Sequence, residues 1–289
     1  MALLDSLSTG VSAMQGFSEQ LGVIGNNIAN VSTTGFKSSN VNFEESFSNT
    51  LNGASNSGSS ATTVNPMQVG TGVNIARISG DFSQGTLVST GINSNLAVSG
   101  NGFFQVLNPS NNSMYATRDG TFSVNSQGFL VTADGYHVQG LTGGSAGTPP
   151  ATVGDIRLGT PPAGTQLQSY NVDSGGNINE LYSDGSTAVT NQVLLQSYSN
   201  PAALSAVGNN LFTSSASAGP IGGATLTAAN NVAGANGLGS IQSGSLEQSN
   251  VDLTSQFADM ITAERSFQAS SRVITVSDAV LQEIVNLTH

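Results

Sequence analysis

Apolar residues recur every three or four positions at the start of this 289-residue chain, a spacing typical of one face of a helix. The series consists of Leu4, Leu7, Val11, Met14, Phe17, Leu21, Ile24 and Ile28. Glycines within the series each weaken a helix by up to about 1 kcal/mol relative to alanine, so we expect tertiary packing to hold it. The turn-forming residues from Val31 to Gly35 predict that the helix ends near Asn30.

A heptad pattern marks the other end of the chain. One apolar column recurs every seven residues and consists of Leu253, Met260, Phe267, Ile274 and Leu281. The column expected to pair with it, at Phe257, Glu264, Ser271, Asp278 and Val285, is only half apolar. Neither Gly nor Pro occurs from residue 251 to 289, which predicts one long helix.

The C-terminal helix carries more apolar surface than a single partner helix can cover. Val273, Val280 and Leu287 add a further column beside the first, so we expect the helix to contact several partners. We assign the assembly contacts of this helix to Leu253, Phe257, Met260, Ile261, Phe267, Ile274, Leu281 and Val285. Glu264 and Asp278 are either solvated surface or polar groups that fix the register between copies.

The sequence between the helices is typical of β-structure. Short apolar runs at residues 73–78, 96–98, 103–107 and 192–198 are separated by turn signals. The dipeptides Asp119-Gly120, Asp134-Gly135 and Asp184-Gly185 are typical of tight hairpins. Dense turns between short strands favour an antiparallel sandwich or barrel, and the lack of a fixed-period repeat disfavours a solenoid.

These patterns predict an α+β fold in five parts. Residues 1–30 form the N-terminal helix and residues 31–72 an extended linker, in which residues 52–65 are low-complexity sequence that we expect to be exposed and mobile. Residues 73–213 form a central β-domain, residues 214–249 a Gly-rich return, and residues 250–289 the C-terminal helix. The two helices pair like a coiled coil, and their remaining apolar flanks are expected to meet neighbouring copies of the chain.

Composition excludes several classes of protein. Only 8% of the residues are charged, and the net charge of −11 without a basic cluster argues against nucleic-acid binding. With no cysteine, the chain has neither a disulfide framework nor a thiolate metal site. No apolar run approaches the roughly 18 residues of a membrane span, and residues 1–17 lack the pattern of a cleavable signal.

Catalytic and metal-binding patterns are weak. His137 lies in a strand-like context without a second His nearby, so a structural role is favoured over a metal site. Asp155 and Asp173 could form a carboxylate pair, but a chain with 17 acidic residues offers many such pairs. We therefore predict neither an enzyme nor any cofactor or metal.

Motifs at both ends and in the middle carry a family resemblance. The run from Gly25 to Lys37 resembles the N-terminal signature of the bacterial flagellar rod and hook family, through Asn26, Asn27, Asn30, Gly35, Phe36 and Lys37. Residues 247–253 and 259–267 resemble its C-terminal signature. Residues 81–86, 99–104, 115–120 and 200–212 look like its first β-domain, so the resemblance covers nearly the whole chain.

The resemblance implies a structural subunit that polymerises into a hollow axial tube. It further implies export through the flagellar type III apparatus, and contact with the distal rod, hook cap and hook–filament junction proteins. Residues 24–27, 81–82 and 250–253 favour a short hook subunit, whereas residues 31–34 and the chain length favour the distal rod. We expect the hook; the alternatives are the distal rod, and more distantly a secreted adhesin or a carbohydrate-active enzyme.

Overall fold

The computed structural model describes residues 2–52, 66–144, 149–159, 166–214, 216–223 and 226–287. The chain forms two compact units. The first contains Met1–Ala29, Ser39–Asp81 and Val251–His289, and the second contains Asn30–Ser38 and Phe82–Asn250. Most of the segment predicted to be mobile, residues 53–65, lies outside the described residues.

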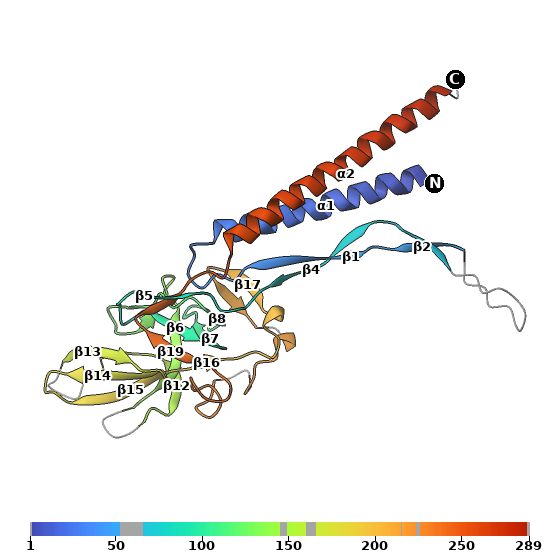
Figure 1. Cartoon of the computed structure of the whole chain (residues 1–289). Coiled ribbons are helices and arrows are strands. Elements are labelled where there is room, and N and C mark those ends of the chain that lie inside the picture. The colour runs from blue at the N-terminus through green and yellow to red at the C-terminus, as the bar shows by residue number, and fades with distance from the viewer. Residues whose placement is uncertain are drawn as a thin grey trace, which may run out of the picture. The chain divides into compact units, whose positions relative to one another are not determined.

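Two long helices dominate the described part of the first unit. Helix α1 (Ala2–Ala29) and helix α2 (Leu253–Leu287) lie side by side, as Figure 1 shows, and both confirm the helices predicted from periodicity. Thr254 donates its backbone N–H to the carboxylate of Asp252, which caps the start of α2. Within the described residues, neither helix combines the length and hydrophobicity needed to cross a bilayer.

A long antiparallel hairpin packs against α1 in the same unit. Strand β1 (Ser39–Glu45) pairs with β4 (Val73–Gly80), and β2 (Ser48–Asn52) pairs with β3 (Met67–Gly70). The ring of Phe43 lies beside Gly16 and 5.7 Å from the ring of Phe17, measured between centroids. We expected the β-domain to begin at residue 73, but β4 pairs with β1 beside the helices, since a strand pattern does not identify the strand's partner.

The second unit is built on an antiparallel sheet of twelve strands among the described residues. Its main path runs β13-β14-β15-β11-β7-β8-β18-β17, with β9, β10, β12 and β16 attached beside it. The strand bounds are β7 (Phe103–Leu107), β8 (Met114–Thr117), β9 (Ser123–Val124), β10 (Leu130–Val131), β11 (His137–Thr142), β12 (Thr152–Asp155), β13 (Leu167–Val172), β14 (Asn177–Tyr182), β15 (Thr187–Val193), β16 (Leu195–Gln196), β17 (Ser205–Gly208) and β18 (Leu211–Thr213).

Shorter elements complete this unit. Strand β6 (Leu96–Ser99) pairs with β19 (Ser240–Ser243), and β5 (Leu87–Ser89) pairs with β20 (Ser245–Glu247). Short 3-10 helices span Pro201–Ala203 and Ala216–Ala218. The two-strand pairs join residues from opposite ends of the unit, so the chain leaves the β-structure close to where it entered.

The core of the second unit is apolar and closed. Phe104, Leu96 and Leu195 are fully buried in its main cluster, where Phe104 meets Phe122 edge to face at 5.1 Å between centroids. A second cluster places Phe103 and Tyr198 edge to face. Together with the paired helices of the first unit, this antiparallel β-structure confirms the predicted α+β class.

Two of the three predicted hairpins are present. Gly135 and Gly185 adopt positive φ in the turns between β10 and β11 and between β14 and β15. Asp119-Gly120 is not a hairpin, because β8 pairs with β7 and β18 rather than with the strand that follows it. A side chain at Gly120 would collide with the carbonyl oxygen of Leu96, so this glycine permits a close backbone approach instead.

Candidate functional site

The inner face of α2 differs from the predicted heptad seam. Met260, Phe267, Ile274 and Leu281 are half-buried, but the column predicted beside them stays outside, with Phe257, Glu264 and Val285 exposed. The buried residues of α2 are Gln256, Ala263 and Ser277. They share one heptad column, which lies three positions after the column that begins at Leu253. The helices pair as predicted, but the small side chains of Ala263 and Ser277, which carry little hydrophobic signal, lie on the buried side of α2 beside the half-buried apolar column.

Small residues let α1 and α2 approach closely. A Cβ at Gly10 would lie 3.0 Å from the Cγ1 of Ile274, and the hydroxyls of Ser6 and Ser277 are 3.3 Å apart. Of the predicted α1 positions, Ile24 is buried, Val11 is exposed, and Leu7, Met14, Phe17, Leu21 and Ile28 are half-buried. Leu4 lies within α1, but its side chain is outside the described part of the structure. Gly10, which weakens α1 as an isolated helix, therefore serves its packing against α2.

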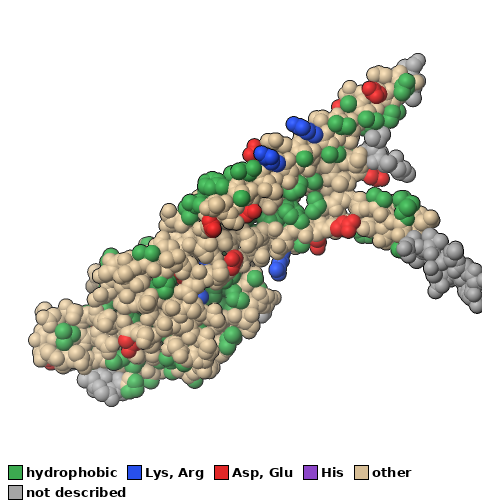
Figure 2. All heavy atoms as spheres, viewed as in Figure 1, with side chains coloured by type: hydrophobic (Ala, Val, Ile, Leu, Met, Phe, Trp, Pro, Cys, Tyr) green, Lys and Arg blue, Asp and Glu red, His purple; other side chains and the backbone are tan. Residues whose placement is uncertain are grey.

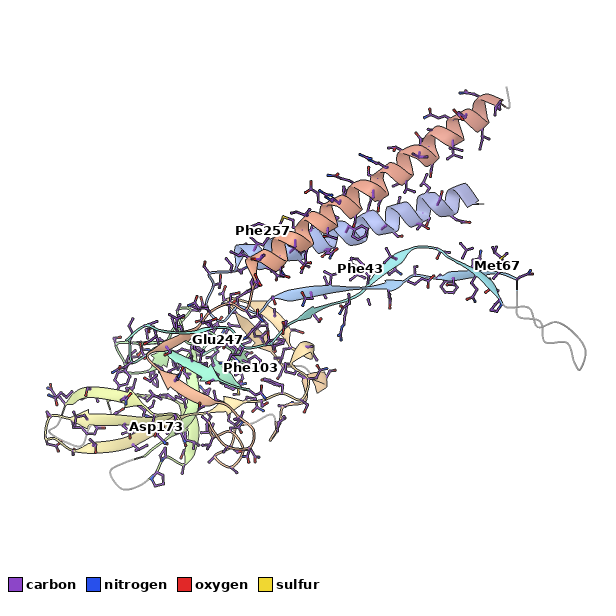
Figure 3. All side chains as sticks on the ribbon, viewed as in Figure 1. Phe43, Met67, Phe103, Asp173, Glu247 and Phe257 are labelled. Atoms are coloured by element: carbon purple, nitrogen blue, oxygen red, sulfur yellow. The ribbon has the colours of Figure 1, made fainter. Side chains whose placement is uncertain are left out.

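The outer face of α2 exposes large apolar side chains. Phe257 is 50% exposed and is labelled near the start of α2 in Figure 3. Figure 2 shows apolar and basic side chains together along this helix. The exposed large apolar residues of α2 are Leu253, Phe257, Ile261, Val273, Val276, Val280, Ile284, Val285 and Leu287. They fall in two groups, at residues 253–261 and 273–287, and exposed apolar groups of this kind are typical of surfaces that bind another protein chain.

The hairpin carries a second exposed apolar surface. Phe47 is 76% exposed beside β2, and Leu51, Met67 and Val69 on β2 and β3 are also exposed. Figure 3 labels Met67 at the far end of the hairpin from Phe43. A two-stranded ribbon of this kind buries little apolar surface by itself.

Asn27 is a buried polar hub inside the first unit. Its Oδ1 accepts a hydrogen bond of 2.9 Å from the backbone N–H of Ser39. Its Nδ2 donates to the carbonyl oxygen of Ser39 at 2.8 Å and to the Oε1 of Gln256 at 2.9 Å. One amide thus joins the end of α1 to the start of β1 and the start of α2, whereas the neighbouring motif residue Asn26 is exposed.

A buried charge cluster lies inside the second unit, where Figure 3 labels its central residue, Glu247. The Nζ of Lys37 lies 2.6 Å from one carboxylate oxygen of Glu247, and the Nη1 of Arg118 lies 3.1 Å from the other. Lys37 also donates to the carbonyl oxygen of Ser83, and the backbone N–H of Gly85 donates to Glu247. Burial lowers the pKa of Arg118, and the adjacent Glu247 carboxylate opposes that shift.

This charge cluster joins three motifs that are far apart in the sequence. Lys37 comes from the N-terminal signature, Arg118 from the β-domain motif and Glu247 from the start of the C-terminal signature. We did not single out Arg118 or Glu247 from the sequence, because charged residues are usually solvated. The signal available was scarcity, since the whole chain has only six Lys and Arg residues.

The remaining motif residues shape the loop around this cluster. Gly35 adopts a φ of +66°, and a side chain there would collide with the backbone of Asp119. Its N–H donates to the carbonyl oxygen of Glu247 at 2.8 Å. Phe36 is half-buried, and its N–H donates to the carbonyl oxygen of Thr33. The N–H of Thr33 in turn donates to the carbonyl oxygen of Asn30. The motif therefore encodes a tight turn that brings Lys37 to Glu247.

The residues considered for chemistry have structural partners. The Nδ1 of His137 lies 2.7 Å from a carboxylate oxygen of Asp155, and its ring stacks on Phe129. Asp173 accepts hydrogen bonds from the N–H groups of Gly175 and Asn177, which closes the turn before β14. Asp155 and Asp173 thus serve different local contacts. Among the described residues, no three His or acidic side chains form a group that could hold a metal.

Three family models match successive parts of the chain. The flagella basal body rod protein model matches residues 7–37 and the flagellar hook protein FlgE/F/G D1 domain model matches residues 97–180. The flagellar basal body rod FlgEFG protein C-terminal model matches residues 242–287. Lys37, Arg118 and Glu247 each fall within a different one of these three regions.

Full-length relatives agree with these matches. The chain is 39% identical to the flagellar basal-body rod protein FlgG of Bacillus subtilis over 285 residues, covering 99% of both chains. It is 32% identical to the FlgG of Borreliella burgdorferi, again over 99% of both chains. The flagellar hook protein FlgE of Borreliella burgdorferi is 27% identical over an alignment of 452 residues that includes 99% of this chain. The motifs, the fold and the full-length matches confirm the resemblance: the chain belongs to the flagellar rod and hook family of structural proteins.

Proposed function

We propose that this chain is a distal-rod subunit of the flagellar basal body and assembles with its own copies through α1 and α2. The observation that carries the proposal is the outer face of α2, where nine large apolar side chains are exposed. Complete burial of one such side chain contributes about 1.5–3 kcal/mol. Contacts with neighbouring copies would bury this face, and the gain would be repeated for every subunit added.

The relatives favour the rod. From the sequence alone we had expected the hook. Rod proteins of two organisms match 99% of this chain and 99% of their own length. The hook protein of Treponema pallidum is 44% identical, but over 139 residues that make up 30% of its length. The alignment with the hook protein of Borreliella burgdorferi spans 452 residues, so that protein carries further sequence between the segments it shares with this chain.

The hook remains the second candidate, because the hook protein of Borreliella burgdorferi aligns with 99% of the chain. Local identity to one hook protein exceeds the full-length identity to the rod relatives. Both candidates imply export through the flagellar apparatus and contact with other axial proteins. They differ in location, since a rod subunit crosses the periplasm and a hook subunit is extracellular.

The predicted assembly residues now separate into two proposed roles. We assign Met260, Phe267, Ile274 and Leu281 to pairing with α1 inside one subunit, because they are half-buried. We assign Leu253, Phe257, Ile261 and Val285 to contacts between copies, because they are exposed. Removal of residues 251–289 should therefore abolish assembly and leave the β-structure folded.

A labelled copy tests the location. The turn at Asp184-Gly185 is exposed between β14 and β15, so a short epitope inserted there leaves the helices untouched. Antibody-gold on isolated hook–basal bodies should decorate the rod. Labelling of the hook would overturn the rod assignment in favour of the second candidate. Absence of label from hook–basal bodies that form normally in this strain would contradict both.

A further inference from the structure

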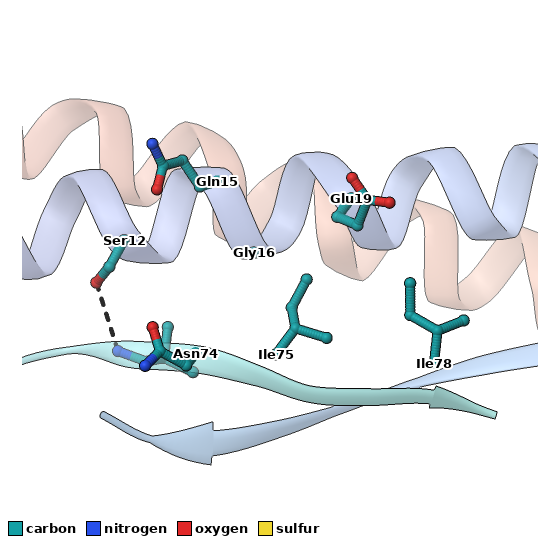
Figure 4. A pocket seen from close by; sticks show the side chains of 8 residues that line it. Ser12, Gln15, Gly16, Glu19, Asn74, Ile75 and Ile78 are labelled. Carbon is teal, nitrogen blue, oxygen red and sulfur yellow. Dashed lines mark hydrogen bonds between the residues drawn. The ribbon is translucent and has the colours of Figure 1, made fainter. Parts of the chain in front are cut away.

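A groove lies between α1 and β4 in the first unit. It has a volume of about 440 Å³, and Figure 4 labels Gln15, Gly16, Glu19, Asn74, Ile75 and Ile78 among the residues that line it. Ser12 closes one end, where its hydroxyl meets the backbone N–H of Val73 at 3.4 Å. Gly16 lines the groove on the helix side, where the ring of Phe43 lies beside it.

The two walls of the groove differ in chemistry. Ile75 and Ile78 of β4 point toward α1 in Figure 4, and Ile78 is 47% exposed. The helix wall presents the exposed amide of Gln15 and the exposed carboxylate of Glu19. Within the described residues, Glu19 has neither a hydrogen-bond nor an ion-pair partner. A protein segment that fills this groove should therefore present both apolar side chains and a cationic side chain.

One stripe of α2 has this combination. Arg272 and Val276 lie one turn apart on the same side of the helix, and Val273 lies beside Arg272. Arg272 and Val273 are exposed, and Val276 is 62% exposed. The guanidinium of Arg272 has no partner among the described residues. Its aliphatic stem can lie on Ile78 while its charged end reaches Glu19.

We propose that the α1–β4 groove of one subunit receives the Arg272–Val276 stripe of α2 from a second copy, with Arg272 paired to Glu19. Charge complementarity selects this occupant, because the groove has one unpaired acid and the stripe one unpaired base. Apolar complementarity agrees, since Val273 and Val276 meet Ile75 and Ile78. The inference rests on the proposed self-assembly and names the surfaces that meet.

Arg265 provides a matched control on the same helix. It lies seven residues before Arg272, or about 10 Å along the axis at 1.5 Å per residue, and it is also exposed. Its chain neighbour is the acidic Glu264, whereas the neighbours of Arg272 are Ser271 and Val273. The groove has one acid, so only one of the two arginines can pair in it.

The absence of cysteine allows a direct test by cross-linking. Cells would express two differently tagged full-length copies, one carrying Glu19→Cys and the other Arg272→Cys. After mild oxidation of isolated hook–basal bodies, a disulfide-linked heterodimer is expected at about fivefold the yield from the control pair Glu19→Cys and Arg265→Cys. Equal yields, or no heterodimer in basal bodies that contain both copies, would overturn the groove assignment.

A charge exchange tests the ion pair separately. Glu19→Arg and Arg272→Glu should each lower incorporation into basal bodies by up to about fivefold, the ratio for a strong exposed pair. The double variant should restore incorporation, whereas Glu19→Arg with Arg265→Glu should not. If Glu19→Arg lowers incorporation and Arg272→Glu does not restore it, the proposed ion pair between Glu19 and Arg272 is wrong. Failure of the wild-type chain to enter basal bodies would instead refute the proposed function.

Discussion

The two compact units of this chain distribute their apolar residues in opposite ways. In the second unit, large side chains such as Phe104, Leu96 and Ile156 are fully buried. Over the described part of α2, the buried residues are Gln256, Ala263 and Ser277, while nine large apolar residues are exposed. The second unit thus closes its core within one chain. The described part of the first unit instead leaves large apolar side chains exposed.

Replacement of a core aromatic should produce the largest loss of stability. Phe104→Ala removes a fully buried ring, which should lower the free energy of unfolding of the β-structure by about 3–5 kcal/mol. Phe257→Ala, at a half-exposed ring, is the matched control and should change it by less than about 1 kcal/mol. Denaturant titration followed by tyrosine fluorescence measures both. Equal losses of unfolding free energy in the two variants would contradict the difference in burial between the two units.

Neutralisation of the buried carboxylate should have an effect nearly as large. Glu247→Gln leaves Lys37 and Arg118 buried without their counter-charge, which should cost about 3–5 kcal/mol. Glu264→Gln, at an exposed position on α2, should change the unfolding free energy by no more than about 0.5 kcal/mol. Unchanged stability in Glu247→Gln would show that the charge cluster does not hold the second unit together.

Alkaline pH should weaken the closed unit to an intermediate extent. Burial raises the pKa of Tyr182, as does its hydrogen bond to the Glu180 carboxylate, and burial also raises that of Tyr198. Above pH 10 the unfolded chain loses these protons first, so stability falls by up to about 1.4 kcal/mol per pH unit per tyrosine. Thermal melting between pH 8 and pH 11 should show the fall, and Tyr182→Phe should reduce it. A flat profile would contradict the assigned burial.

Helix glycines should give the smallest effects. Nothing lies within 4 Å of a Cβ placed at Gly22, so Gly22→Ala should stabilise α1 by up to about 1 kcal/mol. Gly10→Ala meets Ile274 at 3.0 Å and should give no such gain. Far-UV circular dichroism during thermal unfolding compares the two variants. An equal gain at both positions would argue against the close helix crossing.

The sequence predicted the elements better than their partners. Spacing of apolar residues located both helices, and the turns at Gly135 and Gly185 followed from their dipeptides. The buried small residues Ala263 and Ser277 of α2 were not predicted, because they contribute small size rather than hydrophobicity. Pairing of β4 with β1 depends on contacts that a strand pattern does not contain.

The candidate site was predictable in outline only. Family motifs marked Asn27 and Lys37, but their roles depend on partners more than 200 positions away in the chain. The clash that requires glycine at position 35 involves Asp119 and is visible only in three dimensions. The choice of rod over hook rests on full-length relatives, since both kinds of protein share the same terminal signatures.

The most direct test of the account concerns the outer face of α2. Phe257→Ser with Ile261→Ser changes two exposed side chains and leaves the inner column intact. We predict an unchanged melting temperature for the purified subunit and loss of the variant from isolated hook–basal bodies, measured by quantitative immunoblot. Incorporation of the variant at the wild-type level would contradict the claim that this face joins the copies.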